Sequence, residues 1–325
     1  MTSEKPVVIY ALTLHPWMKE MVIAGALPQF EVLFLDIKDE GAVRSVLPRA
    51  DFLVTMKLPA AYVPLLQNCK LVQLHGVGYD GIDVGGLARA GIPLASCPEG
   101  TIVGVAEHTI LLILALYKQL VPVHESMREG KYDHMGWRAN SHLLLGKTVG
   151  IVGLGRVGRR VAQLIHNFES KLIYYDVSRP SAAVEQELGA TYARFEELLT
   201  QADIITVHAP LTPETRGLFG SSEFARMKPG ALFINTSRGG TYDMDALYES
   251  LRSGHLGGAG LDVYNPEPPP PDHPILRLPN VICTPHTAAG TVESQRLKVQ
   301  VQFENFMRVL RGETPHNLLK VASPG

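Results

Sequence analysis

The sequence predicts an α/β protein made of two doubly wound parallel-sheet domains. Short apolar runs alternate with longer amphipathic segments along the chain, which is the pattern of parallel strands joined by crossover helices. A chain of 325 residues is long enough for about two domains. The apolar runs also fall into two series, and each series predicts one sheet.

Each expected strand is a short β-type run, and each expected helix has apolar residues at helical spacing. The strands of the first series are Val7–Leu12, Val32–Asp36, Phe52–Met56, Leu71–Leu74 and Pro93–Ala95. Those of the second series are Thr148–Val152, Lys171–Tyr175, Ile204–Val207, Ala231–Asn235, Gly258–Asp262 and Val281–Thr284. The helices are Ile102–Leu120, Arg156–Phe168, Phe195–Thr200, Met244–Arg252 and Val292–Leu310.

The last expected helix follows the end of the second strand series, so it must pack on the first domain. This order predicts a discontinuous outer domain of residues 1–98 and 287–325, with a middle domain of residues 99–286 inserted into it. Two such crossings are typical of a cleft that opens and closes on a ligand.

Composition and charge exclude several classes of protein. With 46% hydrophobic and 19% charged residues, the chain is of globular type. A net charge of −2 without a block of Lys and Arg argues against a nucleic-acid partner. The three cysteines are far apart, which predicts reduced thiols and neither a disulfide framework nor a metal site.

The two most apolar segments do not predict a membrane protein. The run Val7–Leu12 is too short for a signal peptide and lacks a cleavage pattern. The segment Ile102–Leu116 is interrupted by Glu107 and His108 and falls short of the ~20 residues that span a bilayer. We therefore expect a cytoplasmic protein with a buried helix at this position and no membrane partner.

A glycine motif after the strand Thr148–Val152 predicts a dinucleotide site. Gly153 permits a tight turn, Gly155 lets the backbone approach a pyrophosphate, and Gly158 allows close packing of the following helix. The helix N-terminus attracts the phosphate charge. The expected contacts to the cofactor in this motif are Gly153, Gly155, Arg156, Val157 and Gly158.

An acidic residue at the end of the next expected strand selects the cofactor. Asp176 lies about 20 residues after the glycines, where a carboxylate accepts hydrogen bonds from the ribose hydroxyls of NAD and repels a 2′-phosphate. Arg179 nearby keeps NADP as an alternative. The sequence predicts NAD in preference to NADP.

Three further segments bear polar residues after expected strands, and together they resemble the D-isomer-specific 2-hydroxyacid dehydrogenase family. These segments are Phe233–Gly240, Leu261–Pro268 and Thr284–Ala289, and further matching elements are Gly76–Asp83, His208–Arg216 and Met227–Gly230. The resemblance covers most of the chain. It implies a Rossmann-like NAD-binding domain inserted into a flavodoxin-like substrate domain. It also implies hydride transfer between NAD(H) and C2 of a small D-2-hydroxy or 2-keto acid of glyoxylate or hydroxypyruvate type.

The resemblance assigns the catalytic roles to Arg238, Glu267 and His286, and each role suits the residue's chemistry. An arginine can bind the carboxylate and carbonyl oxygen of a keto acid bidentately. A histidine can deliver a proton near neutral pH. A carboxylate can fix the tautomer of that histidine and raise its pKa.

The resemblance also implies further contacts to the cofactor and the substrate. In the cofactor pocket these are Thr101, His208, Pro210, Thr236 and Asp262, the last as acceptor from the nicotinamide carboxamide. For the substrate they are the amides of Val77 and Gly78 and the side chain of Lys57, which is equally well read as a solvated lysine. The apolar segment from Ile102 to Leu145 matches the dimer contact of the family and predicts a homodimer.

Two alternatives stay open. A phosphoglycerate dehydrogenase-like enzyme is less favoured because Lys57 lacks a second basic neighbour for a phosphate, and because no regulatory domain is expected after Gly325. The other alternative is a non-catalytic, NAD-sensing binding protein of the same fold, since fold alone does not determine function.

Overall fold

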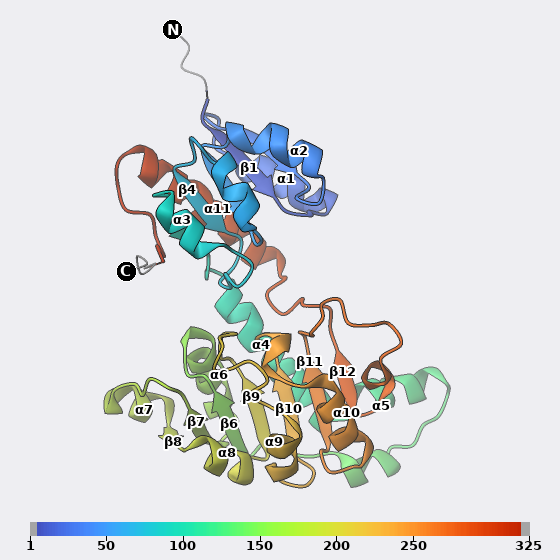
Figure 1. Cartoon of the computed structure of the whole chain (residues 1–325). Coiled ribbons are helices and arrows are strands. Elements are labelled where there is room, and N and C mark those ends of the chain that lie inside the picture. The colour runs from blue at the N-terminus through green and yellow to red at the C-terminus, as the bar shows by residue number, and fades with distance from the viewer. Residues whose placement is uncertain (1–4, 320–325) are drawn as a thin grey trace. The chain divides into compact units, whose positions relative to one another are not determined.

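The chain crosses twice between two structural units (Figure 1). In the computed structural model, which describes residues 5–319, one unit combines the chain up to Thr101 with the segment from Gly290 onward, and the other spans Ile102–Ala289. Each unit contains one parallel sheet, which confirms the predicted fold class.

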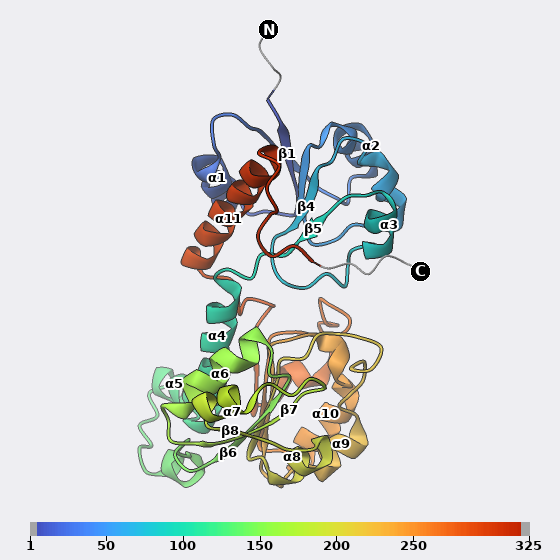
Figure 2. The ribbon, with the colours of Figure 1, turned by 90° about the vertical axis from the view of Figure 1, so that its left-hand side faces the viewer.

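The first unit is a five-stranded sheet in the order β2-β1-β3-β4-β5, the flavodoxin-like order. Its strands are β1 (Val7–Ala11), β2 (Glu31–Leu35), β3 (Phe52–Thr55), β4 (Leu71–Leu74) and β5 (Leu94–Ala95). Its helices are α1 (Pro16–Gly25), α2 (Glu40–Val46), α3 (Val84–Arg89) and α11 (Val292–Leu310). Helices α1 and α11 lie on one face of the sheet, and α2 and α3 lie on the other (Figure 2).

The second unit is a seven-stranded sheet in the order β12-β11-β10-β9-β6-β7-β8. Its strands are β6 (Thr148–Val152), β7 (Lys171–Tyr175), β8 (Ala190–Tyr192), β9 (Ile204–Val207), β10 (Leu232–Asn235), β11 (Gly258–Leu261) and β12 (Val281–Cys283). Its helices are α4 (Thr101–Tyr117), α5 (Leu120–Arg128), α6 (Arg156–His166), α7 (Ala182–Leu188), α8 (Phe195–Gln201), α9 (Ser221–Arg226) and α10 (Met244–Arg252).

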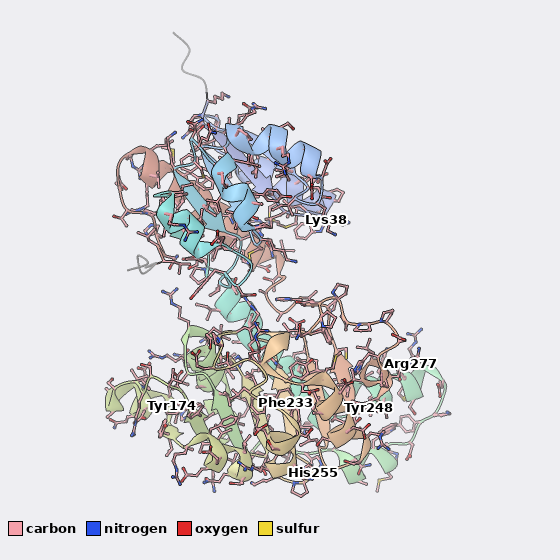
Figure 3. All side chains as sticks on the ribbon, in the orientation of Figure 1. Lys38, Tyr174, Phe233, Tyr248, His255 and Arg277 are labelled. Carbon is pink, nitrogen blue, oxygen red and sulfur yellow. The ribbon has the colours of Figure 1, made fainter. Side chains whose placement is uncertain are left out.

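Two apolar cores cover the two faces of this sheet. Residues of α4, α6 and α7 pack with Ile234, whereas residues of α8, α9 and α10 pack with Phe233, which is labelled in Figure 3. The two neighbours on β10 serve opposite cores because successive side chains of a strand point to opposite faces. Both faces are therefore covered, as a parallel sheet requires, and the loops at the strand ends remain available for ligands.

The long apolar helix differs from its prediction. A single helix was expected over Ile102–Leu120, but α4 ends at Tyr117 because Gln119 adopts a left-handed conformation with φ +53°. The chain then turns by 61° into α5. Among residues 5–319, no single helix is long and apolar enough to cross a membrane, and α4 and α5 reach that length only as this bent pair.

Candidate cofactor and active site

The glycine turn between β6 and α6 contains two glycines that the protein's own packing requires. Gly153 has φ +95°, and a Cβ atom there would lie 2.6 Å from the amide nitrogen of Ala209. A Cβ on Gly158 would lie 2.1 Å from the carbonyl oxygen of Gly153. Gly155 differs, because a Cβ there would meet no protein atom within 4 Å. The backbone at Gly155 therefore faces open space.

Asp176 lies at the end of β7, beside this turn. Its carboxylate accepts hydrogen bonds from the amide nitrogens of Leu154 (2.6 Å) and Ser178 (2.9 Å). These bonds hold the carboxylate next to the glycine turn. Arg179, because of which NADP remained an alternative cofactor, is bound to Glu185 by two hydrogen bonds of 2.8 and 3.0 Å.

His208 follows β9, the neighbour of β6 in the sheet. The chain order reverses between these two strands, and ligands of open α/β sheets bind beyond the carboxyl ends of the strands at such a point. The His208 Nε2 lies 2.9 Å from the Thr206 hydroxyl, and its Nδ1 is buried with no hydrogen-bond partner in residues 5–319. Burial lowers the pKa of His208 to about 3, so the ring is neutral.

These groups fit a dinucleotide. The open space at Gly155 suits a pyrophosphate, and the Asp176 carboxylate suits a ribose diol. The unpartnered Nδ1 of His208 offers one more polar contact. Arg156 and Val157 begin α6, and the exposed Pro210 follows His208 closely in the same loop. Thr101 lies in the first unit, and its hydroxyl is buried without a partner in the described part of the chain.

The loop after β10 fixes the backbone of Arg238. The buried Asn235 accepts a hydrogen bond from the amide of Ser237 (2.9 Å) and donates one to the Thr241 hydroxyl (2.9 Å). The Thr241 hydroxyl in turn donates to the carbonyl oxygen of Arg238 (2.8 Å). The position of Arg238 is thus set by a polar network at the end of the strand, while its side chain remains partly exposed.

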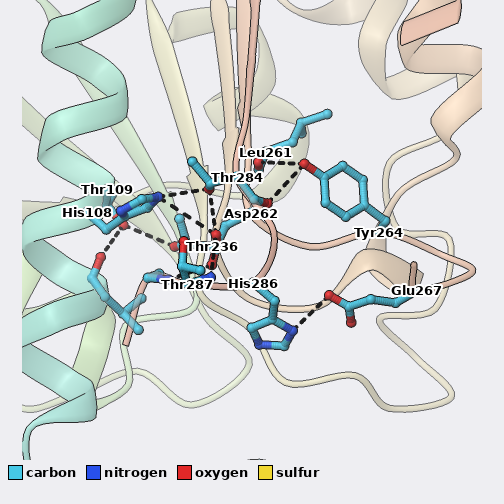
Figure 4. A network of polar contacts seen from close by, with 12 residues as sticks. His108, Thr109, Thr236, Leu261, Asp262, Tyr264, Glu267, Thr284, His286 and Thr287 are labelled. Carbon is cyan, nitrogen blue, oxygen red and sulfur yellow. Dashed lines mark hydrogen bonds and ion pairs between the residues drawn. The ribbon is translucent and has the colours of Figure 1, made fainter. Parts of the chain in front are cut away.

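His286 and Glu267 form a hydrogen-bonded pair in the same unit (Figure 4). The His286 Nδ1 lies 2.8 Å from the Glu267 Oε1, and both side chains keep 40% or more of their surface exposed. The hydrogen bond to Glu267 raises the pKa of His286, against the opposing effects of burial and of the Arg238 charge. The structure therefore brings the three predicted catalytic residues into one electrostatic cluster.

The loop that carries His286 is held by Asp262. His286 has φ +55°, and its amide donates hydrogen bonds to the carbonyl oxygens of Asp262 (2.9 Å) and Thr284 (3.1 Å). The buried Asp262 carboxylate accepts from the Thr284 hydroxyl (2.5 Å) and from the amides of Thr287 and Ala288 (2.9 Å each). The chain's own donors thus use most of the acceptor capacity of Asp262. Its predicted bond to the nicotinamide carboxamide would have to share this carboxylate.

Sequence reasoning missed two residues of this network, both on α4. The His108 Nε2 lies 3.0 Å from the Thr284 hydroxyl (Figure 4). Because that hydroxyl donates its proton to Asp262, the histidine must donate to the hydroxyl oxygen. Thr109 contacts the buried Thr236 hydroxyl at 3.0 Å. These two residues could have been found from the sequence, because His108 and Thr109 are polar residues inside a largely apolar helix.

The predicted substrate contacts of the first unit lie in two of its loops. Val77 and Gly78 follow β4, and Lys57 follows β3 with an exposed side chain. The amide of Lys57 donates a hydrogen bond to the hydroxyl of the buried Thr55 (3.2 Å), which fixes the start of this loop. These three residues belong to a different unit from the cluster of Arg238, Glu267 and His286.

Comparisons with known proteins place the chain in a family. Residues 110–288 match the family described as D-isomer specific 2-hydroxyacid dehydrogenase, NAD binding domain. A D-3-phosphoglycerate dehydrogenase of Archaeoglobus fulgidus is 38% identical over 82% of this chain, which spans 50% of that relative's length. A glyoxylate reductase of Korarchaeum cryptofilum is 36% identical over 92% of this chain and 90% of its own length. The crystal structure of TT0316 protein from Thermus thermophilus superposes with a TM-score of 0.84 and 31% identity, covering 96% of this chain and 99% of that one.

The chain therefore belongs to the D-isomer-specific 2-hydroxyacid dehydrogenase family. It is an NAD-dependent enzyme of this class, and NAD(H) is its cofactor.

Proposed function

We propose that this enzyme reduces glyoxylate, hydroxypyruvate or a closely related small 2-keto acid with NADH. The proposal is supported by the similarity to a glyoxylate reductase over nearly the full length of both chains. The observation that carries it is the His286–Glu267 hydrogen bond of 2.8 Å with the charge of Arg238 nearby, since this arrangement combines a proton donor, His286, with an anion-binding group, Arg238.

The proposed roles follow from the chemistry of each side chain. Bound at Gly153, Gly155, Gly158 and Asp176, NADH supplies the hydride for C2 of the substrate. Arg238 binds the substrate carboxylate and polarises the adjacent carbonyl oxygen. His286 delivers a proton to that oxygen from Nε2, because its Nδ1 is engaged by Glu267. Glu267 fixes the tautomer of His286 and keeps the ring protonated to higher pH.

We assign substrate binding in the first unit to the amides of Val77 and Gly78, which can donate to the substrate carboxylate, and to Lys57. The positive charge of Lys57 would contact an anionic or polar tail of the substrate. A phosphorylated substrate is the second candidate, favoured by the similarity to a D-3-phosphoglycerate dehydrogenase.

A substrate panel tests the proposal. We expect the highest kcat/KM for glyoxylate or hydroxypyruvate when NADH oxidation is followed by absorbance, and a lower value for 3-phosphohydroxypyruvate. A preference for the phosphorylated acid that disappears in Lys57→Ala would favour the second candidate. Tight NADH binding without turnover of any keto acid would contradict both.

The catalytic roles have their own test. Arg238→Ala and His286→Ala should each lose nearly all turnover while NADH affinity, measured by protein fluorescence quenching, stays close to that of the parent enzyme. Loss of NADH affinity in both variants would show that the residues maintain the structure instead.

We also propose that the enzyme is a cytoplasmic homodimer. Large apolar side chains are exposed on and after α5, and this surface supports a subunit contact. They are Leu120, Val121, Met127, Tyr132, Met135, Leu143 and Leu145, which we call the α5 apolar surface. The three free thiols Cys69, Cys97 and Cys283 suit a reducing compartment.

A further inference from the structure

The corner of the second unit beyond β7 contains an arginine that is bound by a neighbouring carboxylate. Arg179 lies three residues after Asp176. Its Nε donates to the Glu185 Oε1 at 2.8 Å, and its Nη2 donates to the Glu185 Oε2 at 3.0 Å. The guanidinium carbon also lies 5.2 Å from the centre of the Tyr192 ring. The guanidinium that could bind an oxyanion is therefore partly engaged by the protein.

Glu185 is the fixed partner in this pair. It lies on α7, and its side chain is 14% exposed, compared with 60% for Arg179. The hydroxyl of Tyr174 donates to the Glu185 Oε1, and Tyr174 lies fully buried on β7 (Figure 3). The hydrogen bonds from Arg179 and Tyr174 lower the pKa of Glu185, so it is ionised at neutral pH. The sheet thus anchors the carboxylate, and the carboxylate holds the arginine.

We propose that Glu185 is a cofactor-selectivity residue that withholds the Arg179 guanidinium from a 2′-phosphate. An arginine close to the ribose-binding acid is the group that accommodates the 2′-phosphate of NADP in this type of fold. The inference rests on the proposed role of Asp176 as the ribose-binding residue.

Two barriers then oppose NADP(H). The Asp176 carboxylate repels the 2′-phosphate directly, and Glu185 neutralises and occupies the cation that would attract it. Removing only one barrier leaves the other in place. Removing both lets Arg179 form a charge-assisted, bidentate contact with the phosphate.

The barriers should therefore be coupled. Arg179 is 60% exposed, and an ion pair of such an exposed side chain contributes modestly, so Glu185→Gln alone should raise the affinity for NADPH by about two- to fivefold. Asp176→Asn removes the charge and keeps an acceptor for only one of the amides of Leu154 and Ser178, because these amides bind different oxygens of the carboxylate. In the double variant the gain in NADPH affinity should exceed the product of the two single gains by about tenfold, as expected for a new bidentate arginine–phosphate contact.

The experiment measures dissociation constants for NADH and NADPH by isothermal titration calorimetry. The proteins are the parent, Asp176→Asn, Glu185→Gln and the double variant, each checked for an unchanged melting temperature. Glu197→Gln is the control, because Glu197 also accepts two hydrogen bonds from an arginine, Arg194, at 3.0 and 2.7 Å in the same unit. The control should leave both dissociation constants unchanged.

Adding Arg179→Ala to the double variant identifies the group responsible. The proposal expects this third substitution to cancel the extra gain in NADPH affinity. Simple additivity of the two single substitutions, or a gain that persists without Arg179, would overturn it. The proposed role of Asp176 in binding the ribose has a separate test. If Asp176→Asn binds NADH as tightly as the parent enzyme, Asp176 does not bind the ribose, and the proposal for Glu185 loses its premise.

Discussion

At the scale of single residues, the glycines of the turn after β6 have separable tasks. Gly153 and Gly158 make room for the protein's own backbone, since a Cβ on either would lie within 2.6 Å of a main-chain atom. Gly155 leaves space for a ligand, because a Cβ added there would meet no protein atom within 4 Å. A fingerprint of three glycines therefore combines two requirements of folding with one requirement of binding.

This difference predicts opposite effects of the same substitution. Gly155→Ala should keep the melting temperature near that of the parent enzyme and weaken NADH binding about tenfold or more, because the methyl group enters the space proposed for the pyrophosphate. Gly158→Ala should lower the melting temperature by roughly 10 °C, because a backbone contact must shift. Thermal unfolding without cofactor and NADH titration measure the two effects. A destabilised Gly155→Ala protein would show that the open space is needed for folding.

The His286–Glu267 pair predicts a pH dependence. Glu267 raises the pKa of His286, so the imidazolium persists to higher pH than it would alone. Reduction of a keto acid needs the protonated ring, and its rate falls as the pH rises through this pKa. Removing the negative charge in Glu267→Gln should move the falling limb of kcat/KM to lower pH.

The profile is measured with saturating NADH, and in the oxidation direction the rising limb should move to lower pH as well. Glu187→Gln, an exposed residue on α7, serves as the control and should leave both limbs in place. A uniform loss of rate with unmoved limbs would indicate that Glu267 orients His286 without affecting its pKa.

At the scale of elements, the loop after β12 and the helix α4 form one polar assembly. Asp262 at the end of β11 accepts three hydrogen bonds from the loop, and His108 on α4 reaches Thr284 in it. The left-handed conformation of His286 is costly for a residue with a Cβ, and these bonds offset that cost. The assembly therefore determines where the imidazole points.

Thr284→Val removes the hydroxyl that links His108 to Asp262 and preserves the side-chain shape. The loss of a hydrogen bond to a buried carboxylate should loosen the loop and lower kcat about tenfold. Thr287→Val is the matched control, since Thr287 contributes its amide to Asp262 and the substitution leaves that amide in place. Steady-state kinetics compare the two variants. Equal activities would show that the loop is held without the Thr284 hydroxyl.

The elements differ in how well sequence reasoning predicts them. The limits of β4, β6, β7 and β9 match the predicted runs, because buried parallel strands are continuous apolar segments. The short helices α1, α2, α3, α7 and α9, the helix α5 and the three-residue strand β8 were missed. Of these, α2, α3, α7 and α9 have only six or seven residues, too few for a clear period, and tertiary packing stabilises them.

In the candidate site, residues of a local motif can be predicted from the sequence, whereas contacts between distant segments cannot. The glycines and Asp176 form a local motif, which can be recognised in the sequence because the spacing between its residues is fixed. His108 acts through Thr284, 176 residues further along the chain, and only the fold brings the two together. The Glu185 that binds Arg179 is a surface carboxylate by sequence, and its partner Tyr174 becomes evident only from the packing of α7 beside β7.

At the scale of the whole molecule, the chain divides its proposed tasks between two units. The second unit contains the cofactor residues and the cluster of Arg238, Glu267 and His286, and the first contains Val77, Gly78 and Lys57. Helices cover both faces of the sheet in the second unit, and the side chains of the α5 apolar surface are part of neither core. The exposed side chains of the α5 apolar surface are therefore in excess of what the fold needs, and a second copy of the chain is the proposed partner.

The double variant Tyr132→Arg, Leu143→Arg tests whether a second copy of the chain binds this surface. Both side chains belong to the α5 apolar surface and are 77% and 62% exposed in the single chain, so the charges should leave the fold of each subunit intact. They would have to be buried in a dimer that covers about 800 Å² per subunit, and an unpaired buried charge opposes association. Multi-angle light scattering after gel filtration should give a dimer mass for the parent and a monomer mass for the double variant. Ile23→Arg, an exposed position on α1 in the first unit, should stay dimeric. A monomeric parent enzyme at micromolar concentration would contradict the proposal.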